Sequence, residues 1–90
     1  MRLEWDARKA RENLRKHGVS FEEASSVIFD PLSATGDDPD HSVDERRLVT
    51  FGVSSSGRLL VVAHTDRGDA IRIVSARPAT RAERKLYEES

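Results

Sequence analysis

The sequence contains no cysteine, and only three of its fifteen basic side chains are lysine. Without cysteine the chain can form no disulfide and carry out no thiolate chemistry, which fits a reducing cytoplasm. No hydrophobic run is long enough to cross a membrane, and residues 1–6 do not have the pattern of a signal peptide. We therefore expect a cytoplasmic protein that does not associate with membranes.

Metal and cofactor motifs are also missing. The three histidines (His17, His41 and His64) lie far apart, with no pair at helical i, i+4 spacing. The aspartates of residues 37–44 do not match a calcium loop, because Pro39 interrupts them and the bidentate glutamate is absent. The sequence has no P-loop, no dinucleotide glycine fingerprint and no GxSxG elbow. These absences predict a protein that uses neither a metal nor a cofactor.

The chain has 90 residues, of which 37% are hydrophobic. That length predicts a single domain over residues 1–90 with one core. A chain of this size buries only about 60–65% of its unfolded surface, so we expect modest stability.

The charge is unevenly distributed although the net charge is −1, which alone argues weakly against a nucleic-acid partner. Residues 1–45 hold 6 basic and 11 acidic side chains, whereas residues 46–90 hold 9 basic and 5 acidic ones. Such a division can place a basic surface on a nearly neutral protein. The preference for arginine fits two-pronged phosphate binding, but a GC-rich genome would also produce it.

Capping signals predict three helices. Asp6 and Gly18 bound the first helix, with Trp5 placed to pack on Ala10. Ser20 and Glu23 form a capping box for a second helix, which ends at Asp30-Pro31. Thr80 and Glu83 form another box, which opens a helix through about Glu88.

The remaining segments predict strands. They are residues 2–5, a short edge strand after residue 33, and residues 46–53, 59–63 and 70–76. The order β-α-α-β-β-β-β-α predicts an α+β fold: a small antiparallel meander with two N-terminal helices and one C-terminal helix, the helices lying to one side.

The segment Leu59–Tyr87 contains the residues that we expect to bind an anion and transfer protons. Arg67, Arg72 and Arg77 lie on or beside its two strands, where each guanidinium must find water or an anion. If the strands pair so that His64 and Arg72 share the face away from the helices, a proton-transfer group lies beside an anion holder. Structural alternatives stay open: His64 as a hydrogen-bonded core residue, Arg72 paired with Asp66 or Glu83, and Arg77 and Arg81 as surface decoration.

Several motifs together resemble the BrnT family of type II toxins. They are Trp5-Asp6, Lys9-Ala10, Asn13, Lys16-His17-Gly18-Val19-Ser20-Phe21-Glu22-Glu23-Ala24, Asp30-Pro31, His41-Ser42, Glu45-Arg46, Gly52, Gly57-Arg58, His64-Thr65-Asp66-Arg67-Gly68, Ile71 to Arg77, and Glu83-Arg84 with Tyr87. The likeness covers almost the whole chain in the correct order.

The resemblance implies a fold similar to that of the RelE family and an endoribonuclease that cuts RNA without a metal and inhibits translation. It also implies a BrnA-like antitoxin with a ribbon-helix-helix domain. Operator DNA would be contacted only through that antitoxin, and a dimer is possible within the complex. The alternative function is a non-catalytic co-repressor that only binds the DNA-binding partner.

On this basis we assign provisional roles. The 2′-hydroxyl would attack the adjacent phosphate, with His64 for proton transfer and Arg67, Arg72 and Arg77 for charge stabilisation. The RNA-binding set is Trp5, Lys9, Arg58, Arg81, Arg84 and Tyr87. Trp5 has a second interpretation as a helix staple, and Tyr87 as a packing residue.

Overall fold

The structure is a computed structural model that describes residues 2–38 and 46–89. The helices are α1 (Ala7–His17), α2 (Phe21–Ile28) and α3 (Arg81–Glu89). The strands are β1 (Arg2–Glu4), β2 (Ala34–Asp37), β3 (Arg47–Val53), β4 (Leu59–Arg67) and β5 (Ala70–Pro78). Most of the predicted acidic loop, including His41, lies outside the described residues.

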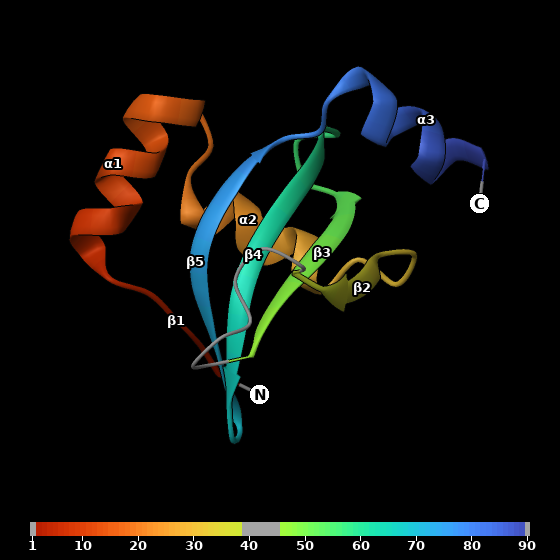
Figure 1. The fold of residues 1–90 in the computed structure, drawn as a ribbon. Coiled ribbons are helices and arrows are strands. Elements are labelled where there is room, and N and C mark those ends of the chain that lie inside the picture. Colours follow the sequence, from red (N-terminus) through yellow and green to blue (C-terminus); the bar gives the residue numbers. More distant parts are fainter. Residues whose placement is uncertain (1, 39–45, 90) are drawn as a thin grey trace.

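The strands form one sheet in the order β1-β5-β4-β3-β2 (Figure 1). The four strands from β2 to β5 are antiparallel neighbours, as expected. β1 is parallel to β5, with Glu4 in register with Arg72, so the expectation of a wholly antiparallel sheet is wrong. The sheet is mixed because β1 and β5 meet through a long crossover that contains all the intervening elements.

The core lies between the sheet and α2. One face of the sheet, here called the inner face, presents Leu60, Val62, Ile73 and Ala76 to the apolar side of α2. The helical residues of this core are Phe21, Ala24 and Val27, and the segment before α2 adds Val19. The other face is called the outer face. β4 is apolar on both faces, as a central strand requires.

The predicted caps are confirmed at Asp6, Gly18 and Thr80, whereas at Ser20 only half of the predicted box is seen: Ser20 Oγ accepts from the Glu23 N–H, and the Glu23 carboxylate bonds to Arg58 instead. Asp6 accepts hydrogen bonds from the backbone N–H groups of Arg8 and Lys9, and Gly18 ends α1 with φ 69°. Thr80 and Glu83 bond reciprocally, side chain to backbone, in a complete capping box. Local hydrogen bonds therefore fix where the helices begin and end.

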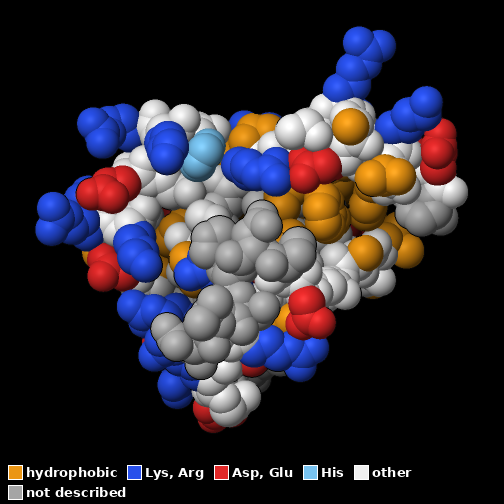
Figure 2. Space-filling view, in the orientation of Figure 1, with side chains coloured by type: hydrophobic (Ala, Val, Ile, Leu, Met, Phe, Trp, Pro, Cys, Tyr) orange, Lys and Arg blue, Asp and Glu red, His pale blue; other side chains and the backbone are white. Residues whose placement is uncertain are grey.

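α3 is held differently from α1 and α2. It lies beyond the end of β5 (Figure 1), and none of its described residues is buried. The expected placement of all helices to one side is therefore not confirmed: α2 packs on the inner face, α1 is attached to the backbone of β5 at Ala76, and α3 lies beyond the end of β5 (Figure 1). A group of exposed apolar side chains lies near α3, and we call it the apolar patch: Leu32 (79% exposed), Val53 (42%) and Leu86 (70%). Figure 2 shows hydrophobic side chains gathered at the upper right, over the α3 side.

Candidate functional site

Arg72 and Arg77 lie on the same face of β5 although five positions separate them. In a regular strand, successive side chains alternate, so residues an odd number apart point to opposite faces. The pairing between β4 and β5 shifts at Val74, a β-bulge that adds one residue to β5. Arg72 is therefore paired with Thr65, and Arg77 with Val61, both on the outer face. The bulge lines up the two guanidinium groups along one surface.

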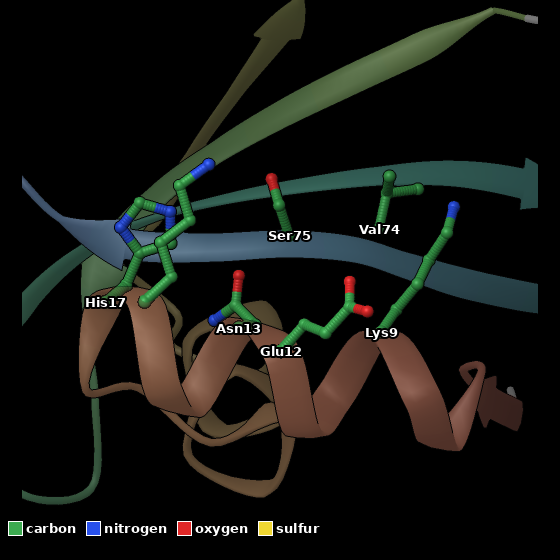
Figure 3. A pocket seen from close by; sticks show the side chains of 7 residues that line it. Lys9, Glu12, Asn13, His17, Val74 and Ser75 are labelled. Atoms are coloured by element: carbon green, nitrogen blue, oxygen red, sulfur yellow. The ribbon is translucent and has the colours of Figure 1, made fainter.

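A groove of about 230 Å³ lies beside this surface, between α1 and β5 (Figure 3). Val74 and Ser75 of β5 form one side of it. The helix contributes residues at i, i+3, i+4, i+7 and i+8 spacing, which is one side of a helix: Lys9, Glu12, Asn13, Lys16 and His17. The groove thus collects three groups that can carry positive charge and one carboxylate, next to the stretch of β5 between Arg72 and Arg77.

Asn13 fixes α1 against β5. Its side-chain amide donates to the carbonyl oxygens of Val19 (2.9 Å) and Ala76 (2.8 Å), and its Oδ1 accepts from the backbone N–H of Ala76 (3.1 Å). The residue is only 7% exposed. A buried amide with these partners satisfied holds the helix at a defined position, and with it the side chains of the groove.

Each strand arginine is held by a carboxylate. Arg72 Nη1 lies 3.0 Å from Glu4 Oε2, which comes from the neighbouring β1. Arg77 forms a two-pronged pair with Glu83, at 2.7 and 2.9 Å. The Arg77 guanidinium is the main cause that lowers the pKa of Glu83 to about 2. These pairs orient the two guanidinium groups on the outer face.

The Asp6 carboxylate feels the charges both of Arg72, near the start of β5, and of Lys9, which lines the groove. Its pKa is lowered first by the backbone N–H groups of Lys9 and Arg8, and further by the charges of Arg72 and Lys9. Arg72 and Lys9 therefore act on one carboxylate. The start of β5 and the N-terminal turn of α1 thus each supply a cation near Asp6. On the left side of Figure 2, Lys and Arg side chains are interspersed with Asp and Glu.

His64 does not share a face with Arg72, so that expectation is wrong. His64 is paired with Ile73 on the inner face, whereas Arg72 is paired with Thr65 on the outer face. The side chain is nearly inaccessible, since the residue is 3% exposed. A buried group on the opposite face has no direct route to a substrate held by Arg72, which argues against the proton-transfer role predicted for it.

The structural alternative for His64 fits the contacts. Its Nε2 lies 2.8 Å from Thr50 Oγ1, which in turn lies 2.7 Å from Thr35 Oγ1. Its Nδ1 is 3.6 Å from Asp66 Oδ1, too long for a hydrogen bond. Burial lowers the pKa of His64, and the Asp66 carboxylate opposes this in part. His64 thus belongs to a polar row across β2, β3 and β4.

Arg58 joins the β3–β4 hairpin to α2. It pairs with both carboxylate oxygens of Glu23, at 2.6 and 3.0 Å, and donates to the Gly18 carbonyl at 3.0 Å. Glu23 also accepts from Ser54 and Ser56 of the hairpin. The Arg58 guanidinium is the main cause that lowers the pKa of Glu23 to about 2. Arg58 does not line the groove, and its RNA-binding role stays a prediction.

The other predicted residues are dispersed. Trp5 packs edge-on against Phe21, with ring centroids 5.9 Å apart. Tyr87 donates from its hydroxyl to the Leu32 carbonyl at 3.2 Å. Arg67 lies at the tip of the β4–β5 hairpin, and two others lie on the exposed surface of α3, Arg81 and Arg84. Of the predicted set, Lys9 lines the groove, and Arg72 and Arg77 share the outer face of β5 without lining it.

The sequence-based assignment missed Lys16 and His17, which line the groove with Glu12. A signal was available, because these residues continue the spacing that begins at Lys9 along α1. That stripe is polar, however, and a polar stripe on a helix normally faces solvent. Only the position of α1 beside β5 shows that it faces a groove.

Over residues 2–38 and 46–89, no group of three or more His, Asp or Glu side chains is arranged to hold a metal ion. No described helix is long and apolar enough to cross a membrane.

The fold and the groove together define a class: a small α+β protein with a cationic groove built from one helix and a bulged strand. The sequence model of a single family, described as the ribonuclease toxin BrnT of a type II toxin-antitoxin system, matches residues 5–83. The chain belongs to this family. No curated protein sequence matches it significantly.

A solved structure gives independent support for the fold. The chain resembles the crystal structure of the Brucella abortus ribonuclease toxin BrnT, with a TM-score of 0.66 and 23% sequence identity. The match covers 90% of this chain and 99% of the other. At this identity the likeness shows a shared fold.

Proposed function

We propose that this chain is a metal-independent endoribonuclease, the toxin of a type II toxin-antitoxin system, and that it inhibits translation by cutting RNA. The observation that carries the proposal is the bulge at Val74, which places Arg72 and Arg77 on one face beside the groove. Two guanidinium groups spaced along one strand, with lysines alongside, suit phosphates spaced along a single strand of RNA.

The reaction is attack of a ribose 2′-hydroxyl on the adjacent phosphorus. Negative charge grows on the phosphoryl oxygens, and cations fixed in advance stabilise that charge without reorganising. Glu4 and Glu83 hold Arg72 and Arg77 in fixed orientations before RNA binds. Lys9 adds a further charge from the helix side of the groove.

The proposed partner is a BrnA-like antitoxin with a ribbon-helix-helix domain, through which the complex contacts operator DNA; dimerisation within that complex is part of the same proposal. The apolar patch supports a protein partner, because Leu32, Val53 and Leu86 remain exposed together beside a helix that buries none of its residues. The same patch favours the second candidate function, that of a non-catalytic co-repressor. Cleavage of RNA by the purified protein distinguishes the toxin from the co-repressor.

The test is cleavage of a single-stranded RNA by the purified protein, in buffer with EDTA. We expect wild type to cut, and Arg72→Ala to lower the rate about 100- to 1,000-fold, as loss of one oxyanion donor does elsewhere. Arg72→Lys should recover only part of the rate, because lysine lacks the two-pronged geometry. Activity that needs an added metal would contradict the proposed mechanism.

The matched control is Arg46→Ala. Arg46 also pairs with a carboxylate, Asp37 at 2.8 Å, but it does not line the groove. The Arg46→Ala variant should cleave RNA at the wild-type rate. Equal loss in both variants would mean that arginine content rather than the β5 surface matters, and no cleavage by wild type would favour the co-repressor function.

A further inference from the structure

The reaction proposed above needs a group that protonates the leaving 5′-oxygen. An alkoxide is a poor leaving group, and a positioned acid contributes about 10²- to 10⁴-fold to such a step. Imidazole is the side chain best suited to this at neutral pH. Of the two histidines in the described residues, His64 is buried on the inner face and His17 lines the groove.

The position of His17 is well defined by the fold. It follows Asn13 by four residues on α1, so it lies one turn beyond the amide that clamps the helix to Ala76. Gly18 then ends the helix in the left-handed conformation. The backbone of α1 therefore places His17 at the end of the groove nearest the C-terminus of the helix.

The neighbouring side chains complete an acid–base arrangement. Lys9 and Lys16 lie on the same stripe of α1 and supply positive charge for a phosphate between them. Glu12 supplies a carboxylate from the same stripe; Figure 3 shows it between Lys9 and Asn13, with His17 further along the helix. A base and an acid are thus separated along the helix, with a cation between them.

We infer that His17 is the general acid of RNA cleavage and that Glu12 is the base; this inference rests on the proposed ribonuclease function. The Glu12 carboxylate takes the proton of the 2′-hydroxyl, and the oxygen forms a new bond to phosphorus. The bond from phosphorus to the 5′-oxygen breaks, and that oxygen takes its proton from the His17 imidazolium. The products are a 2′,3′-cyclic phosphate and a 5′-hydroxyl, after which His17 and Glu12 exchange protons with water.

The test uses His17→Gln and His17→Lys in the same EDTA-containing assay. We expect both to cut RNA at least 100-fold more slowly, while binding to an RNA blocked by 2′-deoxy substitution changes less than threefold. His17→Lys keeps a cation at the end of α1, so it separates proton donation from charge. Wild-type activity should fall as pH rises above neutrality, and that fall should vanish from the residual activity of His17→Gln.

Two further variants decide between this role and others. Arg15→Gln removes a cation from the same turn of α1 outside the groove, and it should cut at the wild-type rate. His41→Gln should retain activity within threefold. Wild-type rates and an unchanged pH profile in His17→Gln, or a selective loss in His41→Gln, would overturn the inference while the ribonuclease function stands; an inactive wild type would overturn both.

Discussion

The two sides of this molecule are held together by different means. On the α1 side, a buried amide clamps the helix to β5 and a stripe of charged residues faces the strand. On the α3 side, a capping box, one ion pair and one tyrosine hydrogen bond hold a helix that has no buried residue. A buried polar residue fixes the first region, whereas the second contributes no buried residue from α3.

The contrast suggests a division of roles. Groups that stabilise a transition state must be held in place before the reaction, which the α1 side achieves. A surface that a partner covers gains from apolar side chains left exposed, which the α3 side provides. Arg77 belongs to both regions, since it lies on the outer face of β5 and pairs with Glu83 of α3.

Removal of the clamp should have the largest effect. Asn13→Ala leaves the backbone groups of Ala76 and the Val19 carbonyl without their partner. Each unsatisfied buried group costs about 1–3 kcal/mol, so we expect the free energy of unfolding in urea to fall by about 3 kcal/mol or more. Arg11→Ala, an exposed position on the same helix, should change it by less than about 0.5 kcal/mol. An equal change in the free energy of unfolding for both variants would show that Asn13 does not fix the α1 side.

Loss of the link between the two sides should have a smaller effect. The pKa of Glu83 is about 2 when folded, below its usual 4.5, so its contribution to stability is present above about pH 4.5 and is lost as pH falls toward 2. Glu83→Gln should lower the free energy of unfolding at pH 6 by about 0.5–1 kcal/mol and weaken the acid dependence. Glu23 titrates in the same window, so part of that dependence remains. Glu88→Gln is the control. If it lowers the free energy of unfolding as much as Glu83→Gln does, the Arg77–Glu83 pair does not stabilise the fold.

Substitution within the apolar patch should affect stability least. Leu86→Ser changes a side chain that is 70% exposed, so the free energy of unfolding should move by less than about 0.5 kcal/mol. Binding of the purified antitoxin, measured by calorimetry, should nevertheless weaken at least tenfold, while Glu88→Gln should bind normally. A loss of stability without a loss of binding would show that the patch stabilises the fold instead.

Local features of the fold could be predicted from the sequence, whereas long-range ones could not. The helix caps at Asp6, Gly18 and Thr80 depend on neighbouring residues, and each is confirmed. The pairing of β1 with β5 joins segments about 68 residues apart and leaves no local pattern.

The site shows the same limit more sharply. Strict alternation along β5 places Arg72 with Ala76, whereas the structure places Ala76 on the inner face; the face of His64 depends on the register between β4 and β5, which neither strand shows alone. The bulge at Val74 reverses the phase midway along the strand, and no turn residue or glycine marks it. Sequence patterns identified Arg72 and Arg77 as anion holders, but only the backbone pairing shows which groups can act with them.

The amide of Asn13 has one more consequence, which concerns how other chains can join this sheet. β1 covers only the first residues of β5, and the Asn13 amide occupies both backbone groups of Ala76 further along that margin. A strand added at this edge would find the backbone groups of β5 at these positions already hydrogen-bonded. The opposite margin, β2, is exposed at all four of its residues. If a segment of another protein extends the sheet by strand addition, it will do so along β2, on the side of the molecule away from the groove.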